Sequence, residues 1–367
     1  TIKLTCNSSD ITIIAGMADY PAAVVHSSFD PATMASGSVG TGPFVLESHE
    51  VGVKSVSVKN EGFDWWGYSA GRECPLDRIE YIDYGTDPAA WLAAAEADEV
   101  DCFYENVGEY VDVMEGIGWE NSEIATGSTI LIRPNQTTPD ADGNTVYADK
   151  RVRQALAMAV DNNICLELGY ANKGAPADNH HAGSMHPEHD PSVGRLPYDP
   201  AKAKALMAEA GMADYEHELI SIDDDWRKNT TDAVAAQLRD AGIKVKRTIL
   251  PGSTFWNDWA KYPFSSTNWN HRPFAVQVWG LAYRSGEAWN EMGWSNAEFD
   301  ALLAEANSIA DADKRRAVAG KCQALIAEEG CTIQPYWRSL YRSHSSSTVC
   351  DMHIAYHAHV YKWGFKA

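Results

Sequence analysis

The sequence predicts an α/β protein of two lobes, with mixed sheets and a hinge between the lobes. Helix-type and strand-type hydrophobic patterns interleave along most of the chain. The length of 367 residues is typical of two or three domains rather than one. A polar connector that contains Gly and Pro, residues 137–148, separates two well-patterned regions and is expected to cross between the lobes.

We expect three parts along the chain. Residues 1–136 would form part of lobe I, residues 149–335 would form lobe II, and residues 336–367 would return to lobe I. Thr1 is not an initiator Met, and no charged and apolar leader precedes the fold. The chain is therefore expected to be processed, truncated or numbered from its first ordered residue.

Lobe I is predicted to consist mainly of strands. Valines alternate along 51–58, which indicates a half-buried strand. Asp87 and Pro88 begin a helix, because proline suits the first helical position. The other strands expected in lobe I are 11–14, 44–46, 76–82, 100–103 and 128–133, with 352–365 in the returning segment.

Lobe II is predicted to alternate helices with strands. Asp149 can cap one long helix over 152–168, and Gly211 ends a helix that begins at Pro200. The stretch 171–197 has no periodicity and is expected to be irregular. The remaining elements are strands 217–222, 243–250 and 333–336 and helices 230–241 and 311–326.

The stretch 279–306 is the most distinctive part of lobe II. Its first half is rich in aromatic residues and Gly and has no period, which is typical of a loop lining a pocket. Its second half reads as a helix that Asn296 can cap. A recognition loop that runs into a supporting helix would hold binding groups rigidly. The alternative is that these aromatic residues are simply part of the core.

Composition and charge exclude several classes of protein. The hydrophobic content of 45 % is ordinary for a globular protein, and no run approaches the roughly 18 apolar residues of a membrane helix. The net charge is −21, from 30 basic and 51 acidic residues. Such a chain repels phosphate backbones, so nucleic acid is not an expected partner. A cationic ligand or partner stays open.

The seven cysteines contain no CxxC pair, so the sequence does not support a zinc ribbon or a thioredoxin-like motif. Their odd number excludes complete intramolecular pairing. Cys322 and Cys331 lie at the end of a predicted helix and the start of a predicted strand and could pair in an oxidising compartment. The others are expected to be buried free thiols.

Enzyme and cofactor motifs are absent from the sequence. The turn at 39–43 has two glycines but no phosphate-loop or dinucleotide pattern, and neither GxSxG nor HExxH occurs. We therefore expect no cofactor and no catalytic residues, although a hydrolytic enzyme stays as an alternative.

A cluster of His residues is the sharpest metal-like pattern. Imidazole with thioether suits copper or nickel, and imidazole with carboxylate suits zinc. The alternative to the main prediction of no metal site is a metal or metallophore carrier that uses His180, His181, His186 and His189, with Met185 nearby. A weaker candidate is the set His353, His357 and His359.

Three arginines lie beside Pro, Gly or aromatic residues: Arg133, Arg272 and Arg284. The guanidinium fork makes two charge-assisted hydrogen bonds to a carboxylate, so one of them could hold a ligand carboxylate. Arg284 is the first candidate. The alternative is an ion pair with one of the many acidic residues.

Several motifs agree with one family. They are Gly40-Thr41-Gly42-Pro43-Phe44, Leu76-Asp77-Arg78-Ile79, the helix 152–161, the segment 198–206 with Gly211, Phe299-Asp300-Ala301-Leu302-Leu303 and Ile333-Gln334-Pro335-Tyr336-Trp337. In this order they resemble the family 5 extracellular solute-binding proteins of bacterial ABC importers, the peptide-, opine- and nickel-binding type. Family members usually begin much farther ahead of the first motif, so the N-terminal part of lobe I and a small extra domain are expected to be missing.

The resemblance implies a class II periplasmic-binding-protein fold that closes on a ligand in an aromatic cleft. It implies a monomer in the periplasm, or lipid-anchored outside the cytoplasmic membrane, that delivers a small molecule or short peptide to a permease of the inner membrane. Peptide-binding members place an Asp shortly after a Trp-Gly pair, but here Trp279-Gly280 is followed by Arg284, which favours a carboxylate-bearing ligand. The expected ligand-binding residues are Arg284, Tyr283, Trp279, Trp289, Trp294, Arg133, Trp65, Trp66, Arg272 and Asn270.

Overall fold

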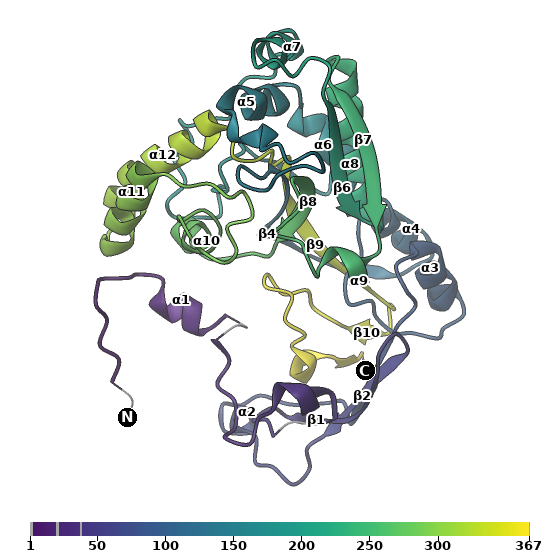
Figure 1. Ribbon diagram of the computed structural model, residues 1–367. Helices are drawn as coiled ribbons and strands as arrows, with labels where there is room; N and C mark the ends of the chain where they lie inside the picture. The colour runs from purple at the N-terminus through teal and green to yellow at the C-terminus, as the bar shows by residue number, and fades with distance from the viewer. Residues whose placement is uncertain (1–2, 20–21, 37–38, 367) are drawn as a thin grey trace. The chain divides into compact units, whose positions relative to one another are not determined.

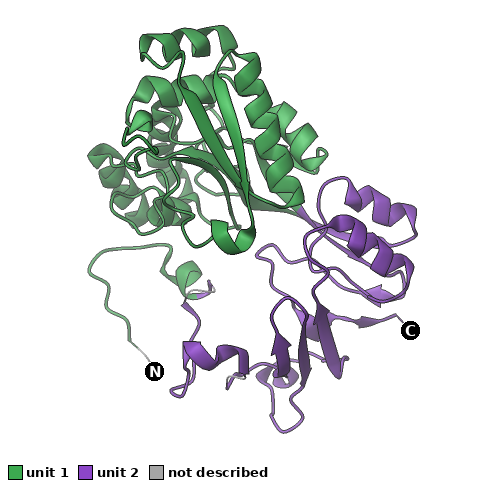
Figure 2. Cartoon of the chain, turned by 45° about the vertical axis from the view of Figure 1, so that its right-hand side comes forward, with its two compact units in different colours: residues 1–17, 125–339 green, residues 18–124, 340–367 purple. Residues whose placement is uncertain are grey.

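The chain forms two compact units, which Figure 2 shows in different colours. The structure, a computed structural model, describes residues 3–19, 22–36 and 39–366. Unit 1 comprises residues 1–17 and 125–339, and unit 2 comprises residues 18–124 and 340–367. Strands β4 (Glu120–Pro134) and β9 (Tyr336–His344) each run from one unit into the other. The chain therefore passes between the two units inside these two strands.

A six-stranded mixed sheet forms the centre of unit 1, in the order β5-β9-β4-β8-β6-β7 (Figure 1). Strands β6 and β7 are parallel, and β4 and β8 are antiparallel. Strand β8 was not predicted, because Phe264–Trp269 contains mostly small polar residues. It is buried nonetheless, since it pairs with β4 on one side and β6 on the other. The other strands of this sheet are β5 (Gly174–Pro176), β6 (Glu216–Ile222) and β7 (Lys244–Leu250).

Three helices of unit 1 begin at capping residues that the sequence indicates. The Asn296 side chain accepts hydrogen bonds from the backbone N–H groups of Glu298 and Phe299, and Asp149 and Asp199 cap their helices in the same way. The helices are α1 (Ile13–Met17), α5 (Lys150–Met158), α6 (Asn162–Tyr170), α7 (Pro200–Glu209), α8 (Asp225–Asp240), α9 (Gly252–Phe255), α10 (Ala275–Ala282), α11 (Ala297–Ser308) and α12 (Ala312–Glu329), with the 3-10 turn η3 (Val146–Ala148).

Three stretches of unit 1 differ from their predicted structure. Residues 11–14 start a helical turn rather than a strand, since Asp10 accepts a hydrogen bond from the Thr12 backbone. The single helix expected over 152–168 is two helices, because the Asp161 side chain caps α6. The stretch from residue 279 is not a loop at its start, since Trp279 lies in the last turn of α10.

Unit 2 holds a three-stranded antiparallel sheet of β1 (Phe44–Glu50), β2 (Lys54–Lys59) and β3 (Arg78–Ile82). A separate aromatic core contains Phe103, Trp91 and Trp119. The helices of unit 2 are η2 (Pro31–Ser36), α2 (Trp66–Ser69), α3 (Pro88–Glu96), α4 (Tyr110–Gly116) and η4 (Val360–Lys362).

The C-terminal segment of unit 2 differs from its prediction. A strand was expected over 352–365, but this segment consists of turns, a 3-10 turn and a two-residue strand, β11 (Gly364–Phe365), which pairs with β10 (Thr348–Val349). The strand expected at 100–103 is only an isolated bridge between Cys102 and His344. Among the described residues, both places form only these short pairings with other strands.

The cysteines are free thiols, so the pairing considered for Cys322 and Cys331 is not formed. Both of these residues are fully buried. In unit 2 a hydrogen bond links the side chains of Cys102 and Cys350, which raises the pKa of Cys102 and lowers that of Cys350. None of the described helices has the length and hydropathy of a membrane span.

Candidate functional site

The loop 283–296 of unit 1 is held to the sheet by one buried carboxylate, that of Glu291. Its Oε2 atom accepts from Arg133 Nε at 2.5 Å and from Thr267 Oγ1 at 2.6 Å, and its Oε1 atom accepts from Trp269 Nε1 at 2.7 Å. The side chains of Arg133 and Glu291 are completely buried. Because a buried charge needs both a partner and hydrogen bonds, this network fixes the middle of the loop against β4 and β8.

Arg133 also donates to backbone carbonyls, those of Glu291 at 2.9 Å, Tyr262 at 3.2 Å and Trp259. Burial lowers the pKa of Arg133, and the carboxylate of Glu291 opposes this effect. In this structure the guanidinium group of Arg133 therefore binds the protein itself and joins three separate segments.

Both ends of the loop 283–296 are fixed by side chains as well. Asn290 donates to the Trp294 carbonyl at 2.7 Å and to the Arg284 carbonyl at 3.1 Å. The Ser285 hydroxyl accepts from the Asn296 backbone at 3.2 Å, directly before α11. The loop therefore has little freedom to change shape, although it contains no regular structure.

Four of the predicted ligand-binding aromatic residues pack inside their own unit. Trp279, Tyr283 and Trp294 belong to the core of unit 1, and Trp279 Nε1 donates to the His180 carbonyl at 3.0 Å. Trp65 is buried in unit 2 against Tyr361. These four rings support the chain around them.

Four other predicted residues, Arg284, Trp289, Asn270 and Trp66, are exposed or half-buried. Arg284 has an exposed side chain that forms an ion pair with Glu287. Trp289 is half-buried, with its ring edge-on to Trp269, and Asn270 is half-buried. Trp66, in unit 2, is 55 % exposed.

Arg272 is buried beside two histidines. Its Nη1 atom donates to the carbonyls of Asn270 and His271, and its own carbonyl accepts from His186 Nε2 at 3.1 Å. The rings of His186 and His271 are stacked with centroids 6.4 Å apart. Burial, together with the neighbouring His271, lowers the pKa of His186 to about 3, so this imidazole is neutral near pH 7.

His181 is completely buried among aromatic side chains. Its Nδ1 atom lies 3.2 Å from the Tyr283 hydroxyl, and its ring contacts Trp269 and Trp337. The Nε2 atom of His181 is buried without a hydrogen-bond partner. Burial lowers the pKa of His181 well below its ordinary value.

The fold separates the four histidines of the alternative metal site considered at 180–189. The ligand atoms of His180 and His189 lie within 4.8 Å of each other and of Asp178, whereas His181 and His186 belong to the contacts described above. Both ring nitrogens of His180 bind backbone, Nε2 with the Val193 carbonyl and Nδ1 with the Ala182 amide. In this structure His180 therefore holds the backbone around it in place.

Sequence reasoning missed the residues that organise this region, above all Glu291 and Gln334. Gln334 Oε1 accepts from the His181 backbone at 2.9 Å. Glu291 lies inside the stretch that the sequence singled out, but a single acidic residue carries no signal of burial. In the sequence Gln334 stands out only as part of a family motif.

Comparison with known proteins places these features in a family. A model described as "Bacterial extracellular solute-binding proteins, family 5 Middle" matches residues 1–290. Heme-binding protein A of Haemophilus influenzae is 25 % identical over 89 % of this chain and 61 % of its own length. A probable peptide ABC transporter periplasmic-binding protein, y4tO of Sinorhizobium fredii, is 25 % identical over 80 % of this chain and 59 % of its own length.

Solved structures share the fold. The oligopeptide-binding protein AppA from Bacillus subtilis, in complex with a nonapeptide, has a TM-score of 0.82 and 19 % identity, over 98 % of this chain and 75 % of that one. The chain therefore has the mixed α/β fold of the two-lobe periplasmic binding proteins. It spans about six-tenths of the length of its first curated relatives.

Proposed function

The chain belongs to the family 5 bacterial extracellular solute-binding proteins, and we propose that it is the substrate-capture subunit of a bacterial ABC importer. In this role it binds a solute outside the cytoplasmic membrane, in the periplasm or tethered by a lipid, and delivers it to a permease. The family match over residues 1–290 is the observation that carries the proposal. The sequence relatives reported above are named as binding proteins, which favours binding over the hydrolytic alternative.

The proposed ligand is a short peptide or another organic solute with a carboxylate. Arg284 is the candidate that can reach such a group, because its side chain is exposed and its partner Glu287 comes from the same surface loop. Exposed ion pairs contribute little free energy, so a ligand carboxylate can replace Glu287 at small cost. Trp289 offers a half-buried ring five residues away in the sequence.

The buried residues of the loop 283–296 support this role indirectly. Glu291 and Asn290 hold the loop in one shape, and Trp294 packs on Phe299 of α11 with ring centroids 4.8 Å apart. A rigid loop loses little conformational entropy when it binds a ligand. We therefore assign Glu291, Arg133 and Trp294 to positioning and Arg284 and Trp289 to ligand contact.

A metal carrier is the second candidate function, and the grouping of Asp178, His180 and His189 within 4.8 Å favours it. The backbone contacts of His180 rank it below the organic solute, because binding a metal would break at least one of them.

Native mass spectrometry of the purified chain, followed by denaturation and identification of any released compound, tests the proposed function. We expect one small organic acid or peptide per chain. A bound transition metal without an organic compound would favour the second candidate. Conversion of the bound compound into a product would contradict a pure binding role.

Arg284→Ala tests the ligand contact once a ligand is known. We expect binding to weaken about 10- to 100-fold, because a hydrogen bond to a charged group contributes roughly 1.5–3 kcal/mol. The control is Arg316→Ala, which removes a half-buried arginine that pairs with an acidic residue three positions away, Asp313, and also donates to the Pro187 carbonyl. Glu287→Gln should strengthen binding, since it frees the Arg284 guanidinium. Equal affinities for all three variants would contradict the role of Arg284.

A further inference from the structure

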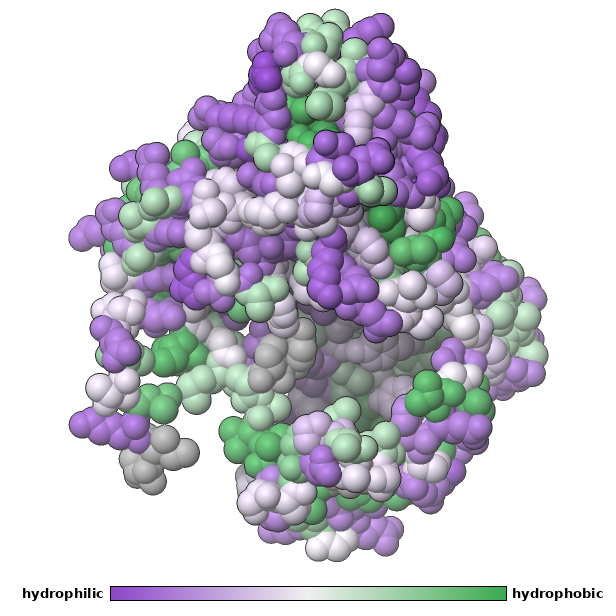
Figure 3. All heavy atoms as spheres, viewed as in Figure 1, coloured by the Kyte–Doolittle hydropathy of each residue, from purple (hydrophilic) through white to green (hydrophobic). Residues whose placement is uncertain are grey.

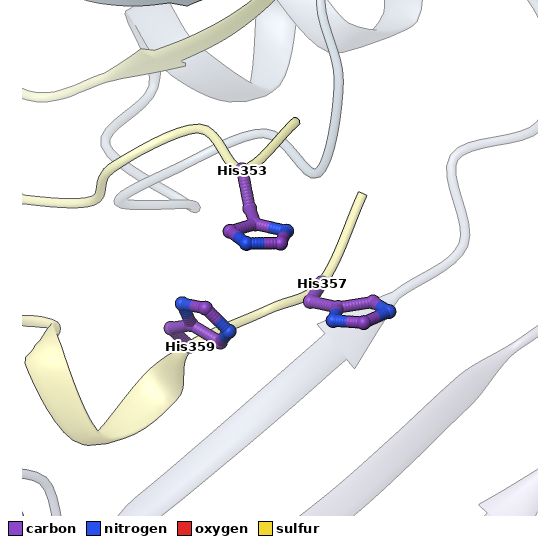
Figure 4. Close-up of side chains that lie close together, drawn as sticks. All are labelled: His353, His357 and His359. Carbon is purple, nitrogen blue, oxygen red and sulfur yellow. The ribbon is translucent and has the colours of Figure 1, made fainter. Parts of the chain in front are cut away.

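Three imidazole rings gather in the C-terminal segment of unit 2, away from the loop 283–296 in the sequence. Figure 4 shows His353, His357 and His359 grouped around a common space. One ring nitrogen from each lies within 4.8 Å of those of the other two. The ring centroids are 4.3 Å apart for His353 and His359, 5.0 Å for His353 and His357, and 6.0 Å for His357 and His359.

These spacings match those of imidazoles that share one metal ion. Nitrogen ligands lie at roughly 2.0–2.1 Å from zinc in tetrahedral sites, which puts neighbouring ring centres about 5 Å apart. The three observed separations lie on both sides of that value. We propose that His353, His357 and His359 form a binding site for one divalent transition-metal ion of the zinc or nickel type.

The ring nitrogens have few competing partners. The Nδ1 atom of His359 is buried without a hydrogen-bond partner, which is costly unless another group satisfies it. His353 Nδ1 accepts from the Ala355 backbone at 3.2 Å, and metal binding exchanges this long hydrogen bond for a metal–nitrogen bond. His357 is exposed, so the ion has a path to the site from solvent.

The backbone that carries the first two rings is anchored on both sides. Arg342 Nη1 donates to the Asp351 carbonyl at 2.6 Å, and the Met352 backbone donates to Ser122 Oγ at 2.9 Å. At the next turn the Tyr356 hydroxyl donates to Glu105 Oε1 at 2.9 Å. A metal site needs such support, because ligands that must first be ordered bind more weakly.

Some charged residues near the site favour a bound cation and others disfavour it. Asp351 favours a cation near His353 and His359, whereas Lys362 disfavours it near both rings and Arg342 disfavours it near His353. The Lys362 ammonium lies 3.5 Å from the Asp351 carboxylate, so the two largely offset each other. The net charge of −21 raises the concentration of cations at the protein surface. Hydrophilic side chains cover much of the face shown in Figure 3.

The donor set indicates the type of ion. Imidazole suits zinc, copper and nickel, whereas magnesium and calcium prefer oxygen ligands. Three protein ligands leave the fourth tetrahedral position open to water or to a group of a bound solute, as in zinc sites that keep an open position. The site thus goes beyond the proposed function and does not depend on it.

The experiment uses the full chain after removal of metals by dialysis against a chelator, with Zn²⁺ titrated by isothermal calorimetry. We expect one ion per chain. His357→Ala should weaken Zn²⁺ binding by more than about 100-fold, beyond the 10- to 100-fold that loss of an outer partner of a metal ligand costs. This side chain is exposed, so the variant is expected to fold.

Two controls assign the ion to these residues. His49→Gln removes an exposed histidine of β1 in the same unit and should leave Zn²⁺ binding unchanged. Asp178→Asn combined with His189→Gln changes the other cluster and should also leave it unchanged. Absence of Zn²⁺ binding, or binding that persists in His357→Ala and His353→Ala but is lost in the Asp178 and His189 variant, would overturn the proposal. A Co²⁺ absorption spectrum typical of tetrahedral coordination, absent in His357→Ala, would support it independently of the calorimetry.

Discussion

Two histidine-rich segments of this chain look alike in sequence and differ in their surroundings. In residues 178–189 of unit 1, His180 and His181 are completely buried and His186 nearly so, and each has a hydrogen bond within unit 1. In residues 353–359 of unit 2, the rings are half-buried or exposed and lie against one another. The first segment uses imidazole to join parts of a core, and the second holds imidazoles that can accept a ligand.

Residue type and spacing alone therefore do not show whether a histidine binds a ligand or supports the core. The denser cluster, around 180–189, had the stronger metal signal in the sequence, but only His180 and His189 come together there. The weaker pattern near the C-terminus gives the closer group of rings. Hydrogen-bond partners on the surrounding elements decide which nitrogens remain available.

The largest expected effect on the free energy of unfolding comes from replacing Glu188, in the segment 178–189. Its carboxylate is buried, accepts from Arg315 Nε at 2.7 Å and accepts from the Ala275 backbone at 3.1 Å. Glu188→Ala should lower the free energy of unfolding by about 3–5 kcal/mol, because it leaves the Arg315 charge buried without its partner. Urea unfolding followed by circular dichroism measures the loss. The control is Asp313→Ala. This variant removes an exposed carboxylate, the partner of Arg316, from the helix that also carries Arg315, and it should unfold like the parent.

The segment 353–359 should instead become more stable when it binds metal. If the three rings bind Zn²⁺, an ion concentration one hundred times the dissociation constant adds about 2.7 kcal/mol to the stability of unit 2. Thermal unfolding with Zn²⁺ should therefore shift to higher temperature, and Mg²⁺ should cause no shift. His357→Ala should remove the Zn²⁺ effect. A shift of the same size in that variant would contradict the assignment.

Lowering the pH should destabilise the segment 178–189 more than the segment 353–359. His186 has its pKa lowered to about 3 in the folded chain, against roughly 6.5 when unfolded. Because the unfolded chain binds this proton first, stability falls as pH drops from about 6.5 towards 3, by at most about 1.4 kcal/mol per pH unit for this one group. Unfolding measured between pH 7 and pH 4 should show a smaller slope in His186→Asn than in the parent. An unchanged slope in His186→Asn would show that His186 is not the origin of the pH dependence. His49→Gln serves as the control variant.

The smallest effect is expected for His357→Ala without metal. The side chain is exposed, and surface substitutions usually change the free energy of unfolding by no more than about 0.5 kcal/mol. Chelator-treated parent and variant should therefore unfold at the same urea concentration. A loss of several kcal/mol would mean that His357 supports the fold, as the histidines of the first segment do.

The element pattern could be predicted wherever the information is local. Asp87, Asp149, Asp199, Asn296 and Asp311 each cap the helix that the sequence places after them. Such caps depend on a side chain and the backbone two or three residues away, so they can be read directly. The sequence pattern did not reveal the helical turn that begins at residues 11–14 or the start of a second helix after Asp161. In both places a polar side chain caps the backbone and competes with a continuous apolar pattern.

The local structure of the candidate site could be predicted only in part. The stretch 279–306 does contain a fixed loop before a capped helix, as the pattern indicated. Its aromatic residues could not be divided in advance, since Trp279 and Trp289 look alike in sequence. Only Trp289 stays near the surface.

The family, the mixed α/β class and several helix starts could be read from the amino-acid sequence, since these depend on ordered motifs, periodicity and caps. Only the tertiary structure decided that Arg133 binds Glu291, 158 positions away in the chain, and that Arg284 pairs at the surface. It also decided which histidines come together. Ion pairing and metal geometry depend on distances of a few ångström between residues far apart in sequence, and the packing of strands and helices sets those distances.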